Sequence, residues 1–168
     1  MRPARFLPAG FAAACFAVLL AGCGFTPLYA TPGLADGLSR IDVVAPHGRV
    51  GYLLAEDLDD GLARNRTSGA RWRLTMQVVE TRAPRGLSLS DVAQYYVLGV
   101  TVRYTLNDLA TGRAVHSGEV VSQVNYDATD QPYAAIAARQ DGQQRLASDA
   151  ARKIQMDLSL WLASQSRG

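Results

Sequence analysis

The chain has 168 residues, of which 48% are hydrophobic and 19% are charged, and its 17 basic residues exceed its 15 acidic residues by two. This length suffices for one domain with a hydrophobic core and is short for two domains of ordinary size. Sequence-independent nucleic-acid binding depends on clustered positive charge, which this composition does not provide. We therefore expect one globular domain that does not bind nucleic acid.

The first residues have the layout of a bacterial lipoprotein signal peptide. Two arginines are followed by an almost entirely apolar run over residues 6–20. This run is shorter than the roughly 20 residues that a helix needs to cross a membrane. Residues 20–23, Leu-Ala-Gly-Cys, then resemble the lipobox, in which the cysteine sulfur receives a diacylglyceryl group before cleavage. We predict that residues 1–22 are removed and that Cys23 becomes the lipidated first residue.

The cysteine content agrees with lipidation. Cys15, the other cysteine, lies in the segment that would be removed, so the mature chain could form no intramolecular disulfide. Acyl chains on Cys23 would anchor the protein to a membrane without spanning it. The alternative is an ordinary secretory signal with a chance cysteine. We expect no cofactor and no metal beyond the N-acyl and S-diacylglycerol groups on Cys23.

Residues 23–39 are predicted to form a lipidated N-terminus and a flexible tether, because glycines and prolines occur there without regular spacing. A folded domain is expected over residues 40–165. It opens with a short strand in residues 40–46 and a helix over residues 49–63. Four apolar residues form one stripe of this helix: Val50, Leu54, Leu58 and Leu62. Its acidic residues are interpreted as a solvated face and not as a metal site, namely Glu56, Asp57, Asp59 and Asp60.

Three segments alternate between apolar and polar residues, which is typical of strands with one buried face. They cover residues 71–80, 96–106 and 114–126, and residues 84–90 between the first two are predicted to be a loop. The turn-forming residues 107–113 predict an antiparallel hairpin between the second and third strands.

A second helix is predicted from Pro132 nearly to the C-terminus. Its apolar stripe comprises Leu146, Ala150, Ile154, Leu158 and either Trp161 or Leu162. The order of elements predicts an α+β fold: a single two-layer domain with an approximately four-stranded sheet and two α-helices packed on one face. Trp72 and Trp161 belong to apolar stripes and are expected in the core.

Several motifs together resemble the LptE family of lipopolysaccharide-assembly lipoproteins. The most specific is the run CGFTPLY at residues 23–29. The hairpin of residues 96–113 and the run Asn-Tyr-Asp at residues 125–127 add to it, as do Tyr133-Ala134 and the helix that contains Arg145-Leu146-Ala147 and Ile154. The resemblance extends from Leu20 to about Leu162. It implies lipid attachment at Cys23.

The resemblance also implies partners and a location. The protein would lie in the periplasmic leaflet of the outer membrane, anchored by lipid, and would bind the β-barrel LptD as a plug and assembly factor. It would assist transport of lipopolysaccharide to the cell surface. Lipopolysaccharide carries phosphates that arginine can bind with two parallel hydrogen bonds. Three arginines on predicted solvent faces of strands are our candidates for this contact, although the family motif does not supply them: Arg71, Arg73 and Arg103.

Two other classes of function were weighed. An enzyme is not expected, because His47 and His116 are the only histidines and no GxSxG, HExxH or phosphate-binding loop occurs. The stronger alternative is a periplasmic lipoprotein that serves an ABC-type lipid exporter of the inner membrane. Such a protein could share this fold, so the membrane that retains it and the partner that co-purifies would separate the two readings.

Overall fold

The structure is a computed structural model that describes residues 33–165 apart from 66, 68 and 88–92. In chain order, its elements are α2 (Leu34–Ser39), β1 (Ile41–Val43), α3 (Arg49–Gly61), β2 (Trp72–Leu87), β3 (Ala93–Asp108), β4 (Ala114–Asp127) and α4 (Pro132–Gln165). The predicted α+β fold is confirmed, with α2 as an additional short helix.

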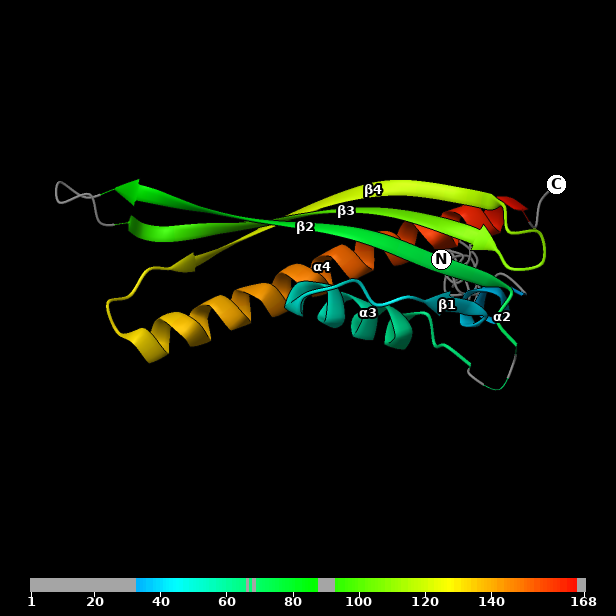
Figure 1. The fold of residues 1–168 in the computed structure, drawn as a ribbon, viewed down its shortest axis with the longest axis horizontal. Coiled ribbons are helices and arrows are strands. Elements are labelled where there is room, and N and C mark those ends of the chain that lie inside the picture. The colour runs from blue at the N-terminus through cyan, green and yellow to red at the C-terminus, as the bar shows by residue number, and fades with distance from the viewer. Residues whose placement is uncertain (1–32, 66, 68, 88–92, 166–168) are drawn as a thin grey trace, which may run out of the picture. The chain divides into compact units, whose positions relative to one another are not determined.

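The four strands form one sheet in the order β1-β2-β3-β4. β1 pairs in parallel with the first residues of β2, and β2, β3 and β4 pair antiparallel. The helices cover one face of the sheet, and the other face has no helix on it in the described part of the chain (Figure 1). The sheet is thus the two-layer, one-sided arrangement that the alternating strands predict.

The core lies between the sheet and the helices, where the predicted stripes are buried. The stripe residues Val50, Leu54 and Leu58 of α3, and Leu62 directly after it, are at most 3% exposed. Leu146, Ala150, Ile154 and Leu158 of α4 are fully buried. α4 has 34 residues, so it runs for about 51 Å at 1.5 Å per residue along the helix-covered face.

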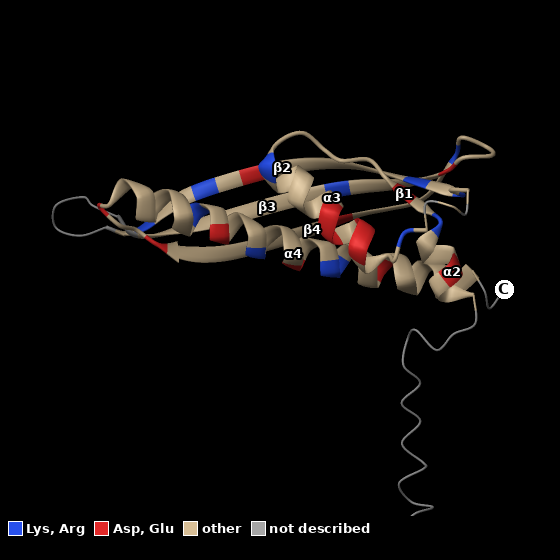
Figure 2. Ribbon diagram, turned by 90° about the horizontal axis from the view of Figure 1, so that it is seen from below, with Lys and Arg blue, Asp and Glu red and all other residues tan. Residues whose placement is uncertain are grey.

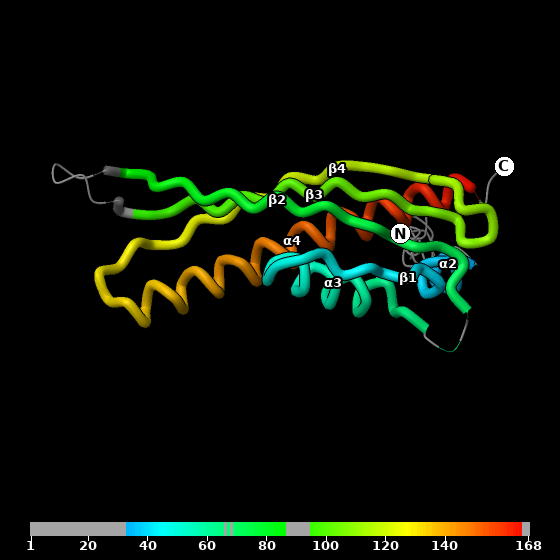
Figure 3. Tube along the Cα trace, in the orientation of Figure 1, coloured from blue at the N-terminus to red at the C-terminus, as the bar shows by residue number. Residues whose placement is uncertain are grey.

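Two predictions about element boundaries were wrong. Residues 34–39 were expected in an irregular tether but form α2, because Leu34 and Leu38 lie on one side of the turn and are buried in the core. β2 was expected to end near residue 80, with a loop over residues 84–90. It continues to Leu87, because β3 supplies backbone partners along its whole length without a bulge. Figure 3 traces this long hairpin beyond the part of the sheet that β1 accompanies.

Candidate binding surfaces

The face of the sheet without helices, called here the open face, carries the odd-numbered residues of β2 and β3 and their partners in β4. At its middle, Val79, Thr101 and Val121 form one row across three strands. Val79 and Val121 are 52% and 51% exposed. The open face also carries the charged residues Arg73, Arg103 and Glu119. Figure 2, seen from the helix-covered side, shows that charged residues of both signs occur along the strands. On the open face, the uncharged row of Val79, Thr101 and Val121 therefore lies among polar and charged residues.

Two of the predicted arginines lie on this open face, each paired with an acid. Arg103 of β3 donates from Nε to Glu119 of β4 at 2.6 Å. Arg73 of β2 donates from Nε to Asp42 of β1 at 3.1 Å. Asp42 also forms an ion pair with Arg64. These side chains thus neutralise one another across neighbouring strands.

The third predicted arginine, Arg71, lies apart from the other two. It precedes β2, and its guanidinium carbon lies 4.6 Å from the centre of the Trp72 ring. Arg73 and Arg103 themselves occupy rows four residues apart along β2, about 13 Å at 3.3 Å per residue. The structure therefore does not bring the three candidate arginines into one cluster.

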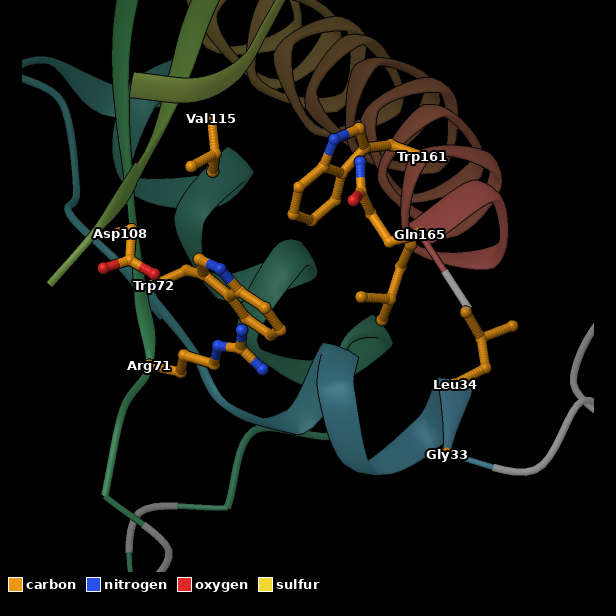
Figure 4. A pocket seen from close by; sticks show the side chains of 9 residues that line it. Gly33, Leu34, Arg71, Trp72, Asp108, Val115, Trp161 and Gln165 are labelled. Carbon is orange, nitrogen blue, oxygen red and sulfur yellow. The ribbon is translucent and has the colours of Figure 1, made fainter. Parts of the chain in front are cut away.

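Arg71 contributes to a pocket of about 570 Å³ at one end of the sheet, between the start of β2, the start of β4 and the end of α4 (Figure 4). Trp72 and Trp161 meet there edge to face, with ring centres 5.8 Å apart. Trp72 is buried as predicted, whereas Trp161 is only partly buried and packs against the core. Leu34, Val115 and Leu162 complete most of the apolar lining.

A polar network joins β3, β4 and α4 next to this pocket. Asp157 Oδ2 accepts hydrogen bonds from Tyr104 Oη and from His116 Nε2, both at 2.5 Å. The His116 ring stacks on Trp161 with centres 5.6 Å apart. Burial, followed by the bond to Asp157, raises the pKa of Tyr104. Burial acts to raise the pKa of Asp157, but the hydrogen bonds from His116 and Tyr104 outweigh it and lower that pKa.

The recorded partners of Tyr104, His116 and Asp157 are one another and neighbouring aromatic rings, so this network links the sheet to α4. Spacing alone could not reveal it, because 41 residues separate His116 from Asp157 and 53 separate Tyr104 from Asp157.

The helix-facing side of the sheet becomes polar toward the far end of β2, which the sequence analysis missed. Arg82 donates to Tyr126 Oη at 2.6 Å and lies 3.6 Å from the centre of the Tyr96 ring. Glu80 accepts a hydrogen bond from Gln143 of α4 at 2.9 Å. Both continue the even-numbered positions that begin with Trp72, so alternation carried past Val78 could have found them. A smaller pocket of about 260 Å³ lies beside Arg82.

Of the four acidic residues of α3, two lie on the solvated face that was predicted and two are half-buried. Glu56 and Asp60 are exposed, and no cluster of metal-binding side chains occurs among the described residues. Asp57 is an exception to the solvated face, since its Oδ2 atom is buried and has no hydrogen-bond partner within the described part of the chain. Burial, with Glu56 and Asp60 nearby, raises the pKa of Asp57.

Comparison with known proteins decides the family. Residues 38–158 match the model of the LptE family, described as lipopolysaccharide-assembly. The chain belongs to the LptE family. This match confirms the resemblance to the LptE family that the sequence motifs indicate. Among curated proteins, no match was found.

Solved structures agree with membership in the LptE family. The chain is 50% identical to a protein from Caulobacter crescentus CB15 described as a lipoprotein, with a TM-score of 0.69 over 79% of this chain and 97% of that chain. Lipoprotein B from Nitrosomonas europaea is 20% identical, with a TM-score of 0.56 over 74% and 84% of the two chains. A minor lipoprotein from Acinetobacter baumannii is 14% identical, with a TM-score of 0.52 over 71% and 88%. The last two support the fold alone.

The predicted lipid attachment site of this LptE-family chain, Cys23, lies outside the described residues. Among the residues that the structure describes, none of the helices is both long and apolar enough to span a membrane.

Proposed function

We propose that this chain is an outer-membrane lipoprotein that binds the lipopolysaccharide-translocating barrel LptD, serves as its plug and assembly factor, and assists lipopolysaccharide transport to the cell surface. The observation that carries the proposal is the LptE family match over residues 38–158. The run CGFTPLY at residues 23–29 supports it, because it joins a lipobox to the family's characteristic start.

The chemistry of the open face is compatible with a place inside a barrel. The lumen of an outer-membrane barrel is polar. On the open face, Arg103 and Glu119 neutralise each other, as do Arg73 and Asp42. A face of this kind can contact a polar wall without exposing a large apolar patch, and its paired charges need no compensation from the partner.

Membrane attachment in this proposal depends on acyl groups on Cys23. Nine residues lie between Cys23 and Gly33, the first described residue, so ten residue-to-residue steps connect them. A chain of that length reaches at most about 33 Å at 3.3 Å per residue. The folded domain would therefore work within a few tens of ångströms of the periplasmic leaflet.

Arg71, Arg73 and Arg103 remain our proposed contacts for lipopolysaccharide phosphates. Arg73 and Arg103 would have to exchange Asp42 and Glu119 for phosphate, while Arg71 would act at the separate pocket beside Trp72. Surface ion pairs contribute about 0–1 kcal/mol each, so a doubly charged phosphate can compete with a carboxylate for these guanidinium groups.

The test is a mild-detergent pull-down of the tagged full-length protein from its native envelope, followed by mass spectrometry of its partner and its N-terminal peptide. Recovery of a large outer-membrane barrel in roughly equal amount, with acyl mass on Cys23, is the expected result. Recovery of inner-membrane transporter subunits instead would refute the proposal and favour an accessory role in an ABC-type lipid exporter.

A further inference from the structure

Strand β2 has an edge that the described chain leaves unpaired. β1 pairs only with residues 72–74 of β2, through Ile41, Asp42 and Val43. β2 continues to Leu87, so most of its length has a neighbouring strand on the β3 side alone. Figure 3 shows β1 running beside only the first part of β2.

The hydrogen bonds between β2 and the residues on either side of β1 show which backbone groups of β2 point toward this edge. The amide of Trp72 donates to the carbonyl of Arg40 at 3.3 Å, and the carbonyl of Leu74 accepts from Val44 at 3.0 Å. Because backbone groups alternate along a strand, the next even-numbered residues also direct their N–H and C=O groups toward this edge. These residues are Met76, Val78, Glu80 and Arg82. Within the described part of the chain, these outward groups form no hydrogen bond.

The opposite edge of the sheet is protected. On β4, Lys153 of α4 donates to the outward carbonyl of Val121 at 2.8 Å, and Arg145 donates to that of Asn125 at 3.4 Å. Asp149 holds Lys153 in place through an ion pair of 2.8 Å. Charged side chains on an edge strand are a usual means of preventing unwanted strand pairing. Side chains of α4 thus bind two outward carbonyls of β4, whereas in the described part of the chain no side chain binds the outward carbonyls of Met76, Val78, Glu80 and Arg82.

The open β2 edge has a defined end and mostly uncharged side chains, Glu80 and Arg82 being the exceptions. Gln77, Val78, Val79 and Thr81 carry no charge. The next outward position after Arg82 is Pro84, which has no N–H to donate and so ends a run of about seven residues. Alternating donors and acceptors along such a run are matched only by another extended backbone.

We propose that residues 76–82 of β2 bind an extended segment of the partner barrel by strand addition. This choice of partner rests on the proposed function. The strands of a closed barrel have no free edges, so the segment would be a loop or a terminal segment of the barrel protein. Glu80 and Arg82 already have partners on the inner side in Gln143 and Tyr126, so an uncharged segment with β-branched residues fits beside Val79.

The experiment compares two substitutions at one position in the full-length, tagged protein. Glu80→Pro removes an outward N–H, whereas Glu80→Ala removes the same side chain and keeps the N–H. Gln123→Pro is the matched control, because residue 123 has the same parity as Val121 and directs its N–H to the protected β4 edge. Pull-down from the native envelope then measures the amount of barrel recovered for each variant, with thermal unfolding as the check on folding.

We expect Glu80→Pro to recover up to about tenfold less barrel than the parent, as loss of one intermolecular hydrogen bond implies. Gln123→Pro should recover the parental amount, and Glu80→Ala should recover clearly more than Glu80→Pro, because it keeps the outward N–H. Equal recovery with Glu80→Pro would overturn strand addition while leaving the proposed function intact. Absence of the barrel from the parent sample would refute the proposed function, and with it this choice of occupant.

A second measurement needs no proline and keeps the inference testable if Glu80→Pro fails to fold. Amide hydrogen exchange at Val78 and Glu80 is compared between the protein alone and its complex with the barrel. Strand addition predicts exchange at least about tenfold slower in the complex, with unchanged exchange at Gln123. Unchanged exchange at Val78 and Glu80 would overturn the inference.

Discussion

The network around Asp157 allows a quantitative prediction about stability. Asp157→Ala removes the acceptor of two hydrogen bonds and leaves the hydroxyl of Tyr104, a residue that is 3% exposed, without its partner. A hydrogen bond to a charged group contributes about 1.5–3 kcal/mol. The Asp157 side chain is 43% exposed, so solvent screening reduces each of the two bonds to about 1–1.5 kcal/mol. We expect the free energy of unfolding to fall by about 2–3 kcal/mol.

Urea unfolding of the chain without residues 1–22, with Cys23→Ser, measures this change. For a domain of this size the dependence on urea is about 1–3 kcal/mol per molar, so the midpoint should fall by roughly 1–2 M. Tyr104→Phe should cost less, and the double variant should be less destabilised than the sum of the two single variants. A midpoint within about 0.3 M of the parent for Asp157→Ala, or strict additivity in the cycle, would refute the network as a unit.

The same network predicts the pH dependence of stability. Although burial acts to raise it, the hydrogen bonds from His116 and Tyr104 hold the pKa of Asp157 below its ordinary value of 3.8. A carboxyl with a lowered pKa in the folded state stabilises the protein above its unfolded pKa, and this contribution is lost as the pH falls through the folded value. The parent should therefore lose more stability below pH 4 than Asp157→Ala does, as measured by urea unfolding across pH 2–7. Parallel curves would contradict this assignment.

Three further predictions concern other sites. Asp57→Asn should raise the free energy of unfolding at pH 7 by a few tenths of a kcal/mol, because a raised carboxyl pKa makes ionisation unfavourable in the folded state; a lower urea midpoint would contradict it. Gly118→Ala should destabilise by about 1–3 kcal/mol, since its Cβ would lie 2.6 Å from Cζ of Tyr104, and thermal unfolding measures this. Replacement of all three candidate arginines by alanine should weaken lipopolysaccharide binding in a direct titration, and parental affinity would exclude them: Arg71, Arg73 and Arg103.

The sequence predicts the part of the fold beside β1 well, because each local pattern there agrees with the tertiary packing. In β2, Trp72 and Leu74 alternate with polar residues, and both are buried. α2 was missed because a helix of six residues has little stability of its own and depends on burial of Leu34 and Leu38 in the core. The length of β2 was missed for a similar reason, since Pro84 suggests a loop unless the pairing of its neighbours with β3 is known.

For the binding surfaces, the sequence could predict only the face of a strand on which a residue lies. Alternation places Arg73 and Arg103 on the open face, and the structure has them there. Their partners could not be predicted, because Asp42 and Glu119 lie 31 and 16 residues away and meet them only through the strand order and register. The same limit applies to Arg71, whose position depends on where β2 begins and on the Trp72 ring beneath it.

The two halves of β2 differ in a way that bears on the partner. In the half beside β1, the positions that face the helices are Trp72 and Leu74, which build a core that needs no partner. In the other half the same face carries Glu80 and Arg82, and charged groups are not used to fill an apolar core. The unpaired edge of β2 lies along this second half. The inner polar groups of the second half are thus paired within the chain, whereas the backbone groups on its outer edge pair with no described strand, and an added strand would pair with them.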